Sequence, residues 1–256
     1  MEALKAAVLR QDPAAYHEAK SLGKAAIPAL RELVQHEDAG VRRIALTCVG
    51  ETGAPEAVEL SLAALADGDE QVAAVAVGNL QPAVDARHQG ALFQGYDKSP
   101  YGLIRGFIAL LVGKLDKAAD AKELQKRLKA EQDPDTQEYG IVALAKLGDK
   151  PSQEAFVSRL HASQGRERRR ILGHAKYIGA AWLLKPLLPL LDDPEPQINL
   201  NVDGMPGPQK DVRSCDLAAT LAAKLSGKKF SFPVEEHAIY SAVQLDEVRK
   251  FLKTAP

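Results

Sequence analysis

The sequence predicts an all-α fold, a right-handed α-solenoid of about seven helix pairs, from two observations. The first is a set of short segments, 28 to 35 residues apart, that each end an apolar helical stretch. They are Leu22-Gly23, Thr52-Gly53, Leu80-Gln81, Leu115-Asp116, Leu147-Gly148 and Ile178-Gly179. The second is composition: the chain is 46% hydrophobic but 5% aromatic, which favours closely packed Ala- and Leu-rich helices over a sheet sandwich. Such a period is typical of stacked two-helix units.

One well-marked repeat shows how each unit is built. Apolar residues at helical spacing occupy 25–34, and a polar break follows over 36–40. A second helix begins near Val41, and Asp38 is expected to cap its N-terminus. The same pattern predicts further helices. They lie over 57–65, 72–80, 101–112, 124–128, 141–147, 155–160, 171–178 and 183–191.

We expect one domain over residues 1–256 with two departures from the regular repeat. Residues 82–113 have a longer loop between their helices. A Pro/Gly-rich insertion at 194–210 cannot be helical, and its alternating start predicts a short strand or hairpin before the helix resumes at Val212. A helix near 243–254 is expected to cap the end of the stack.

Charge and cysteine content exclude several classes of protein. The net charge is −1, with a pI of about 6.6, so nucleic acid is not a favoured partner. Cys48 and Cys215 are far apart in apolar contexts, which indicates buried thiols rather than a disulfide or zinc site. No apolar run approaches the ~18 residues of a membrane span, and residues 1–5 open an amphipathic helix rather than a signal peptide. We therefore expect a cytoplasmic protein with no cofactor or metal and no membrane association.

Two segments, 22–30 and 38–46, carry a resemblance to a known family. The chain resembles HEAT-repeat proteins, and among them the bacterial group with phycobilisome-lyase-type HEAT-like repeats. In that family the first segment is the typical opening of helix A and the second that of helix B, with echoes here at Ile104-Arg105 and 211–219. The resemblance implies a solenoid but no particular activity, because the motif encodes packing.

Basic residues at the start of the B helices allow two interpretations. An Asp at the A-to-B turn and an Arg one turn into helix B can pair within or between units, forming a structural ladder. The same arginines could instead form a binding stripe on the concave B-helix face. We expect residues 166–170 to form a solvated helix end, although four arginines near a helix N-terminus oppose the helix dipole and so need either local acids or an anionic partner. The concave-face candidates are Arg42, Arg43, Arg105, Arg166, Arg169, Arg170, His174 and Arg213.

Two further features are candidates for a specific role. Asp216 lies in an apolar helix, so it needs a partner such as Arg213 or the region of Arg170. We expect a structural tie to the preceding repeat, with a functional acid as the alternative. The insertion is expected to be a passive excursion of the chain, with partner contact through its apolar residues as the alternative. These apolar residues are Ile198, Leu200, Val202 and Met205.

The sequence offers neither a nucleophile with a base nor a Gly-rich phosphate loop. The leading hypothesis is therefore a non-enzymatic scaffold or adaptor that binds another protein, possibly through an acidic segment, along the B-helix face. A lyase-type or chaperone-like protein that holds a chromophore or client is the first alternative. Nucleic-acid binding through a basic concave face is the second, and the oligomeric state is left open.

Overall fold

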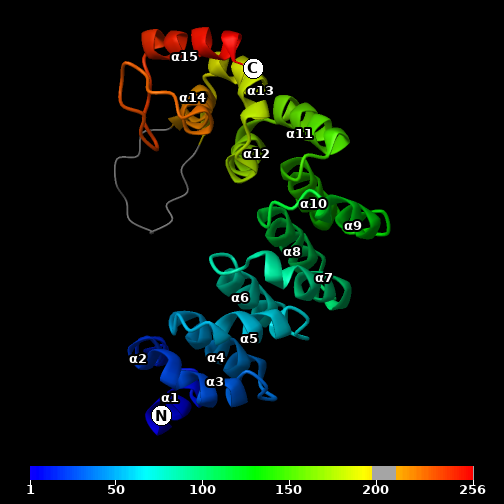
Figure 1. The fold of residues 1–256 in the computed structure, drawn as a ribbon. Helices are drawn as coiled ribbons and strands as arrows, with labels where there is room; N and C mark the ends of the chain where they lie inside the picture. Colours follow the sequence, from blue (N-terminus) through cyan, green and yellow to red (C-terminus); the bar gives the residue numbers. More distant parts are fainter. Residues whose placement is uncertain (198–211, 256) are drawn as a thin grey trace. The chain divides into compact units, whose positions relative to one another are not determined.

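A computed structural model describes residues 1–197 and 212–255. Contacts group the chain into two compact units, Met1–Leu147 and Gly148–Pro256, and each is described by itself (Figure 1). Both are built from helices packed in pairs, so the predicted all-α solenoid is confirmed. The prediction of one domain over the whole chain stays a prediction.

In the N-terminal unit, which is described throughout, helices pack in consecutive pairs, and the second helix of each pair contacts the second helix of the next. The pairs are α1 (Glu2–Leu9) with α2 (Ala14–Leu22), α3 (Ile27–Leu33) with α4 (Ala39–Glu51), α5 (Glu56–Ala64) with α6 (Glu70–Leu80), α7 (Gln89–Lys98) with α8 (Gly102–Lys114), and α9 (Asp120–Leu128) with α10 (Pro134–Lys146). Short 3₁₀ helices, η1 (Gly23–Ala26) and η2 (Ala86–His88), precede α3 and α7. The longer loop predicted between the helices of residues 82–113 is wrong, because α7 runs to Lys98 and α8 begins at Gly102, while η2 lies in the connection before α7.

The C-terminal unit departs more from the regular pattern. Its first pair is α11 (Lys150–Ala162) with α12 (Gly165–Ile178). In its second pair, three short helices, η3 (Ala181–Leu183), α13 (Leu184–Leu187) and η4 (Leu188–Asp192), pack against α14 (Ser214–Ser226). The antiparallel strands β1 (Pro196–Gln197) and β2 (Val212–Arg213) precede α14, and α15 (Ala242–Thr254) follows it. The single helix predicted over 183–191 is wrong, because Pro186 and Pro189 lack the amide hydrogen that a continuous helix needs. The strand predicted within the insertion lies outside the described residues.

Five of the six recurring segments end helices at a residue whose backbone conformation few side chains allow, and Gln81, with φ of −52°, is the exception. Gly53, Gly148 and Gly179 have φ of 61°, 92° and 67°, a region in which glycine avoids the clash of a Cβ atom. Helix starts use aspartate instead: Asp38 accepts a hydrogen bond from the Val41 amide at 2.9 Å, as predicted. Such a cap contributes about 1 kcal/mol.

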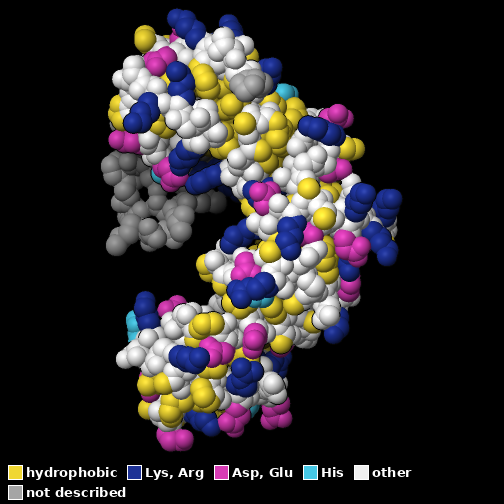
Figure 2. All heavy atoms as spheres, viewed as in Figure 1, with side chains coloured by type: hydrophobic (Ala, Val, Ile, Leu, Met, Phe, Trp, Pro, Cys, Tyr) yellow, Lys and Arg dark blue, Asp and Glu magenta, His cyan; other side chains and the backbone are white. Residues whose placement is uncertain are grey.

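Charged side chains of both signs are interspersed over the face of the molecule in Figure 2. Yellow hydrophobic side chains on this face are scattered among them. This mixture agrees with the near-zero net charge of the chain. It gives this face no broad basic field of the kind that attracts nucleic acid.

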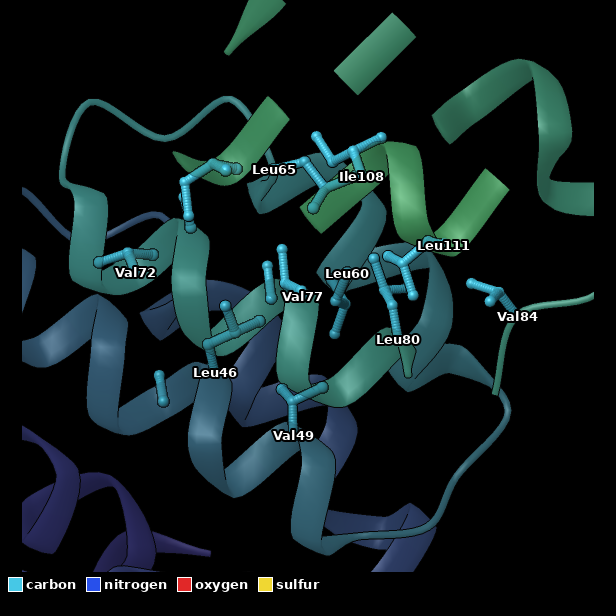
Figure 3. Close-up of a cluster of buried hydrophobic side chains, with 14 of the residues drawn as sticks. Leu46, Val49, Leu60, Leu65, Val72, Val77, Leu80, Val84, Ile108 and Leu111 are labelled. Carbon is cyan, nitrogen blue, oxygen red and sulfur yellow. The ribbon is translucent and has the colours of Figure 1, made fainter. Parts of the chain in front are cut away.

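The core of the N-terminal unit lies between successive helix pairs (Figure 3). Leu46 and Val49 of α4, Leu80 of α6 and Ile108 of α8 all belong to this cluster. All four are almost completely buried. Because each pair supplies only one side of such a cluster, no pair can bury its apolar face without a neighbour.

One place in this core leaves no room for a side chain on its glycine. A Cβ atom added to Gly95 of α7 would lie 2.7 Å from Leu65 Cδ1, whereas one added to Gly90 of the same helix meets nothing within 4 Å. Gly95→Ala is therefore expected to lower the free energy of unfolding by about 2 kcal/mol through overpacking. Gly90→Ala is expected to leave it unchanged or raise it by up to about 1 kcal/mol. Urea unfolding followed by circular dichroism checks both, and equal effects would contradict the close packing at Leu65.

Candidate functional site

Arg42 joins one helix pair to the next. It lies one turn into α4, and its Nε and Nη2 donate to Asp67 Oδ2 and Oδ1 at 2.9 and 2.7 Å. Its Nη1 donates to the backbone carbonyls of His36 and Glu37, both at 2.9 Å. Burial opposes ionisation of Asp67, but the hydrogen bonds from Arg42 and from the Asp69 amide outweigh it and lower the pKa of Asp67.

Arg105 repeats this arrangement on α8. Its Nε and Nη2 donate to Glu131 Oε2 and Oε1 at 2.7 and 2.9 Å, and Nη1 donates to the Ser99 carbonyl. These hydrogen bonds from Arg105 lower the pKa of the Glu131 carboxyl to about 2. On α12, Arg168 pairs with Asp193 through Nη1 alone, and its Nη2 donates to the Ser163 carbonyl. We call these three arginine–carboxylate pairs the ladder.

The ladder follows a fixed register. Each arginine lies four residues after the N-cap of its B helix, and each acid lies in the A-to-B turn of the following pair. The intervening B helices have Ala73 and Gln137 at that position, and the Gln137 amide donates to the Glu131 carbonyl at 2.9 Å. An arginine–carboxylate pair therefore starts from every second B helix. The guanidinium groups of Arg42 and Arg105 are hydrogen-bonded to acceptors within the N-terminal unit.

Arg213 departs from this register because it is the N-cap of α14. It forms a bidentate pair with Asp216 at 2.8 Å and donates to the Tyr240 carbonyl at 2.7 Å. The fully buried Asp216 also accepts from the amides of Arg213 and Tyr240. The predicted partner of Asp216 is thus confirmed, but the tie to the preceding repeat is wrong: Asp216 holds the segment that follows α14.

The remaining sequence candidates lie in different places. Arg43 is half-buried on α4, beside Arg42, and no ion pair joins it to a described residue. Arg166 and Arg170 are exposed on α12, and His174 of the same helix is half-buried. The insertion candidates Ile198, Leu200, Val202 and Met205 lie outside the described residues.

Two B helices of the C-terminal unit form a pocket of about 200 Å³. Along α12 the pocket is lined by Arg169, Leu172, Gly173 and Lys176, which are spaced as one helix face. Leu172 is buried and forms part of the floor. A Cβ atom added to Gly173 would meet nothing within 4 Å, so the missing side chain leaves open space beside the pocket.

The α14 wall has the same spacing. Leu217, Thr220, Leu221 and Lys224 line the pocket, and Leu221 is buried beneath it. The Thr220 hydroxyl lies 3.0 Å from the hydroxyl of Tyr240, so its oxygen is already hydrogen-bonded within the protein. Both helices thus present aliphatic carbon to the pocket and a lysine at one end.

Glu236 closes one side of the pocket, together with His237. The Glu236 carboxylate accepts hydrogen bonds from Lys224 and, at 2.9 Å, from Lys176. These bonds from Lys224 and Lys176 lower the pKa of Glu236 to about 2. The arrangement can hold an apolar group against the floor and a carboxylate or other anion at the lysine end. It has no built arrangement of a nucleophile and a base.

Sequence reasoning identified Arg169 but missed the rest of the pocket. The signal was present as the spacing i, i+3, i+4, i+7, which occurs in Arg169-Leu172-Gly173-Lys176 and again in Leu217-Thr220-Leu221-Lys224. No pattern links either run to Glu236, because this residue reaches the lysines through an irregular segment. It also missed Arg168, the third rung of the ladder.

Over residues 1–197 and 212–255, no group of three or more His, Cys, Asp or Glu side chains is arranged to hold a metal ion. None of the described helices has the length and apolar character to cross a membrane. Cys48 and Cys215 are free and buried, and burial raises the pKa of the Cys48 thiol to about 12.

Comparisons with known proteins agree with this architecture. A family model for HEAT repeats matches residues 3–81. The solved complex of CpcE and CpcF of phycocyanin lyase from Nostoc sp. PCC7120 is similar in fold, with a TM-score of 0.52 and 18% sequence identity over 93% of this chain and 88% of that one. A search of curated proteins found no significant match. The predicted resemblance to HEAT-repeat proteins of the phycobilisome-lyase type is confirmed at the level of fold.

Proposed function

We propose that this HEAT-repeat protein is a scaffold that binds another protein, and that a side chain of the partner docks in the pocket between α12 and α14. The observation that carries the proposal is the pocket itself, with an aliphatic floor and the cations Arg169, Lys176 and Lys224 at its edge. A HEAT stack exposes its B helices as an extended surface suited to another chain. The similar solved structure is itself a complex of two proteins.

The size of the pocket favours a side chain over a whole ligand. Small-molecule sites commonly enclose about 300–1,000 Å³, whereas this pocket holds about 200 Å³. That volume suits one or two aliphatic side chains of a partner whose backbone stays outside. The non-enzymatic role expected from the sequence is part of this proposal.

A lyase-type role, in which the protein holds a chromophore, is the second candidate. Its support is the phycocyanin lyase named in the similar structure, together with the cationic edge of the pocket, which suits the carboxylates of a bilin. Incubation with free bilin tests it. A shifted bilin absorbance band that is lost in a pocket-blocked variant would favour this role over protein binding.

Gly173→Leu is the variant that tests the scaffold proposal, because its side chain fills the pocket without a backbone clash. Gly78→Leu is the matched control: Gly78 is an exposed glycine within the B helix α6 that also has open space around its Cβ position. Both changes raise helix propensity, so neither is expected to lower the melting temperature.

The measurement is affinity capture from the source cell, followed by mass spectrometry. We expect the wild type and Gly78→Leu to retain the same partner and Gly173→Leu to lose it. Nuclease treatment of the lysate separates protein capture from capture through nucleic acid. Equal retention by all three proteins would show that the partner does not use the pocket.

A further inference from the structure

We infer that the segment recognised by the pocket is acidic and carries an aliphatic anchor residue, and that Glu236 occupies the place of its carboxylate in the free protein. This inference rests on the proposed function and specifies the chemistry of the partner. Two lysines of the described pocket lining, Lys176 and Lys224, share the single carboxylate of Glu236. The pocket therefore retains an excess of positive charge when Glu236 is in place.

The contacts that hold Glu236 are of a kind that a ligand can replace. Its side chain is 54% exposed, and those of Lys176 and Lys224 are 63% and 41% exposed. Water competes strongly for ion pairs of this exposure, so each contributes little to stability. A carboxylate arriving on a partner can therefore exchange with Glu236 without unfolding the segment that carries it.

The positive surface continues beyond the pocket, which favours an extended partner. Lys224 also lines a second, more open hollow of about 510 Å³ between the end of α14 and residues 227–234. Exposed Lys228 and Lys229 lie along that hollow. The Lys228 amine lies 5.8 Å from the centre of the Phe230 ring, which keeps its charge at this surface.

These observations together set the order of groups on the partner. An aliphatic side chain fits between Leu172 and Leu221, and a carboxylate beside it replaces Glu236 at Lys224. A chain that continues past Lys224 reaches Lys228 and Lys229, where further acidic residues complement the charge. The free protein thus carries an internal competitor for its own ligand.

The competition predicts that removing a charge from the protein strengthens binding. The probe is a short fluorescein-labelled peptide with one leucine followed by a run of glutamates, titrated by fluorescence anisotropy. Glu236→Gln is expected to bind it about fivefold more tightly than the wild type, and Lys224→Gln about fivefold less tightly, as suits one exposed ion pair each. Added salt is expected to weaken all three.

Glu235→Gln is the matched control, since it changes the net charge equally at the neighbouring exposed residue outside the pocket lining. A gain at Glu236 that exceeds the gain at Glu235 supports the competition. If Glu236→Gln binds no more tightly than Glu235→Gln, or if a peptide with lysines in place of the glutamates binds equally well, the inference is overturned. The scaffold proposal fails by a different result, partner capture that survives Gly173→Leu.

Discussion

Replacing Arg105 with leucine is expected to lower the free energy of unfolding of the N-terminal unit by about 3 kcal/mol, because it leaves a buried carboxylate without its cation. Only 7% of the Glu131 side chain is exposed. After the change, Glu131 keeps hydrogen bonds from the Tyr96 hydroxyl and from two backbone amides. Those bonds satisfy its oxygens but do not balance its charge.

The same effect has a defined dependence on pH. The pKa of Glu131 is about 2 in the folded protein, against 4.5 for an ordinary glutamate. A lowered pKa stabilises the fold fully above about pH 4.5, and this contribution is lost as the pH falls towards 2. Loss of Arg105 raises the pKa of Glu131, so the difference between wild type and variant is expected to shrink as the pH falls. Urea unfolding followed by circular dichroism at pH 7 and pH 3 measures it.

Arg43→Leu is the control for Arg105→Leu, because Arg43 forms no ion pair with a described residue. We expect this change to alter stability by less than about 0.5 kcal/mol. The double variant Arg105→Leu/Glu131→Leu is expected to recover much of the loss, since it removes the stranded charge as well. A cost for Arg105→Leu no greater than that for Arg43→Leu would mean that the ladder does not stabilise the stack.

The fold was predictable because its signals are local. Three local features mark each repeat: apolar residues at helical spacing, an aspartate such as Asp38 at the A-to-B turn, and a glycine such as Gly53 after the B helix. The prediction was wrong over 183–191, where the Leu-rich spacing is helical but Pro186 and Pro189 lie within it. The structure gives the prolines the greater effect, because a missing backbone donor interrupts a helix whatever its apolar pattern.

The ladder and the pocket were predictable only in part, because both depend on contacts between units. From the sequence, Arg42 could be either a ladder residue or a binding residue. The structure shows that its guanidinium forms a bidentate contact with Asp67. Glu236 gave no signal at all. It lies in an irregular segment whose path is set by the buried Asp216, and nothing in local propensity encodes that path.

Asp216→Ala is expected to cost more than any other change considered, about 4 kcal/mol of the free energy of unfolding of the C-terminal unit. The carboxylate is fully buried and accepts four hydrogen bonds, from the Arg213 amide and guanidinium and from the Tyr240 amide. Burial opposes its ionisation, but these bonds outweigh burial and lower its pKa. Alanine would strand the Arg213 cation and leave the Tyr240 amide without an acceptor.

Trp182, the one tryptophan of the chain, reports on this unit through its edge-on contact with Phe156. Denaturant unfolding followed by its fluorescence measures the cost of Asp216→Ala. Asp246→Asn, which removes a carboxylate paired within α15, is expected to leave stability nearly unchanged, because its ion pairs are open to water.

Asp216→Asn separates structure from chemistry at this position. Asparagine keeps the volume and one acceptor but loses the charge that Arg213 balances, so a structural tie predicts a cost between those of wild type and alanine. The segment that carries Glu236 is expected to become less firmly held as the stability cost of the variant increases. Binding of the acidic peptide is expected to change together with this loosening. If Asp216→Ala instead left the fold as stable as the wild type, the burial of a carboxylate there would have to serve the ligand rather than the fold.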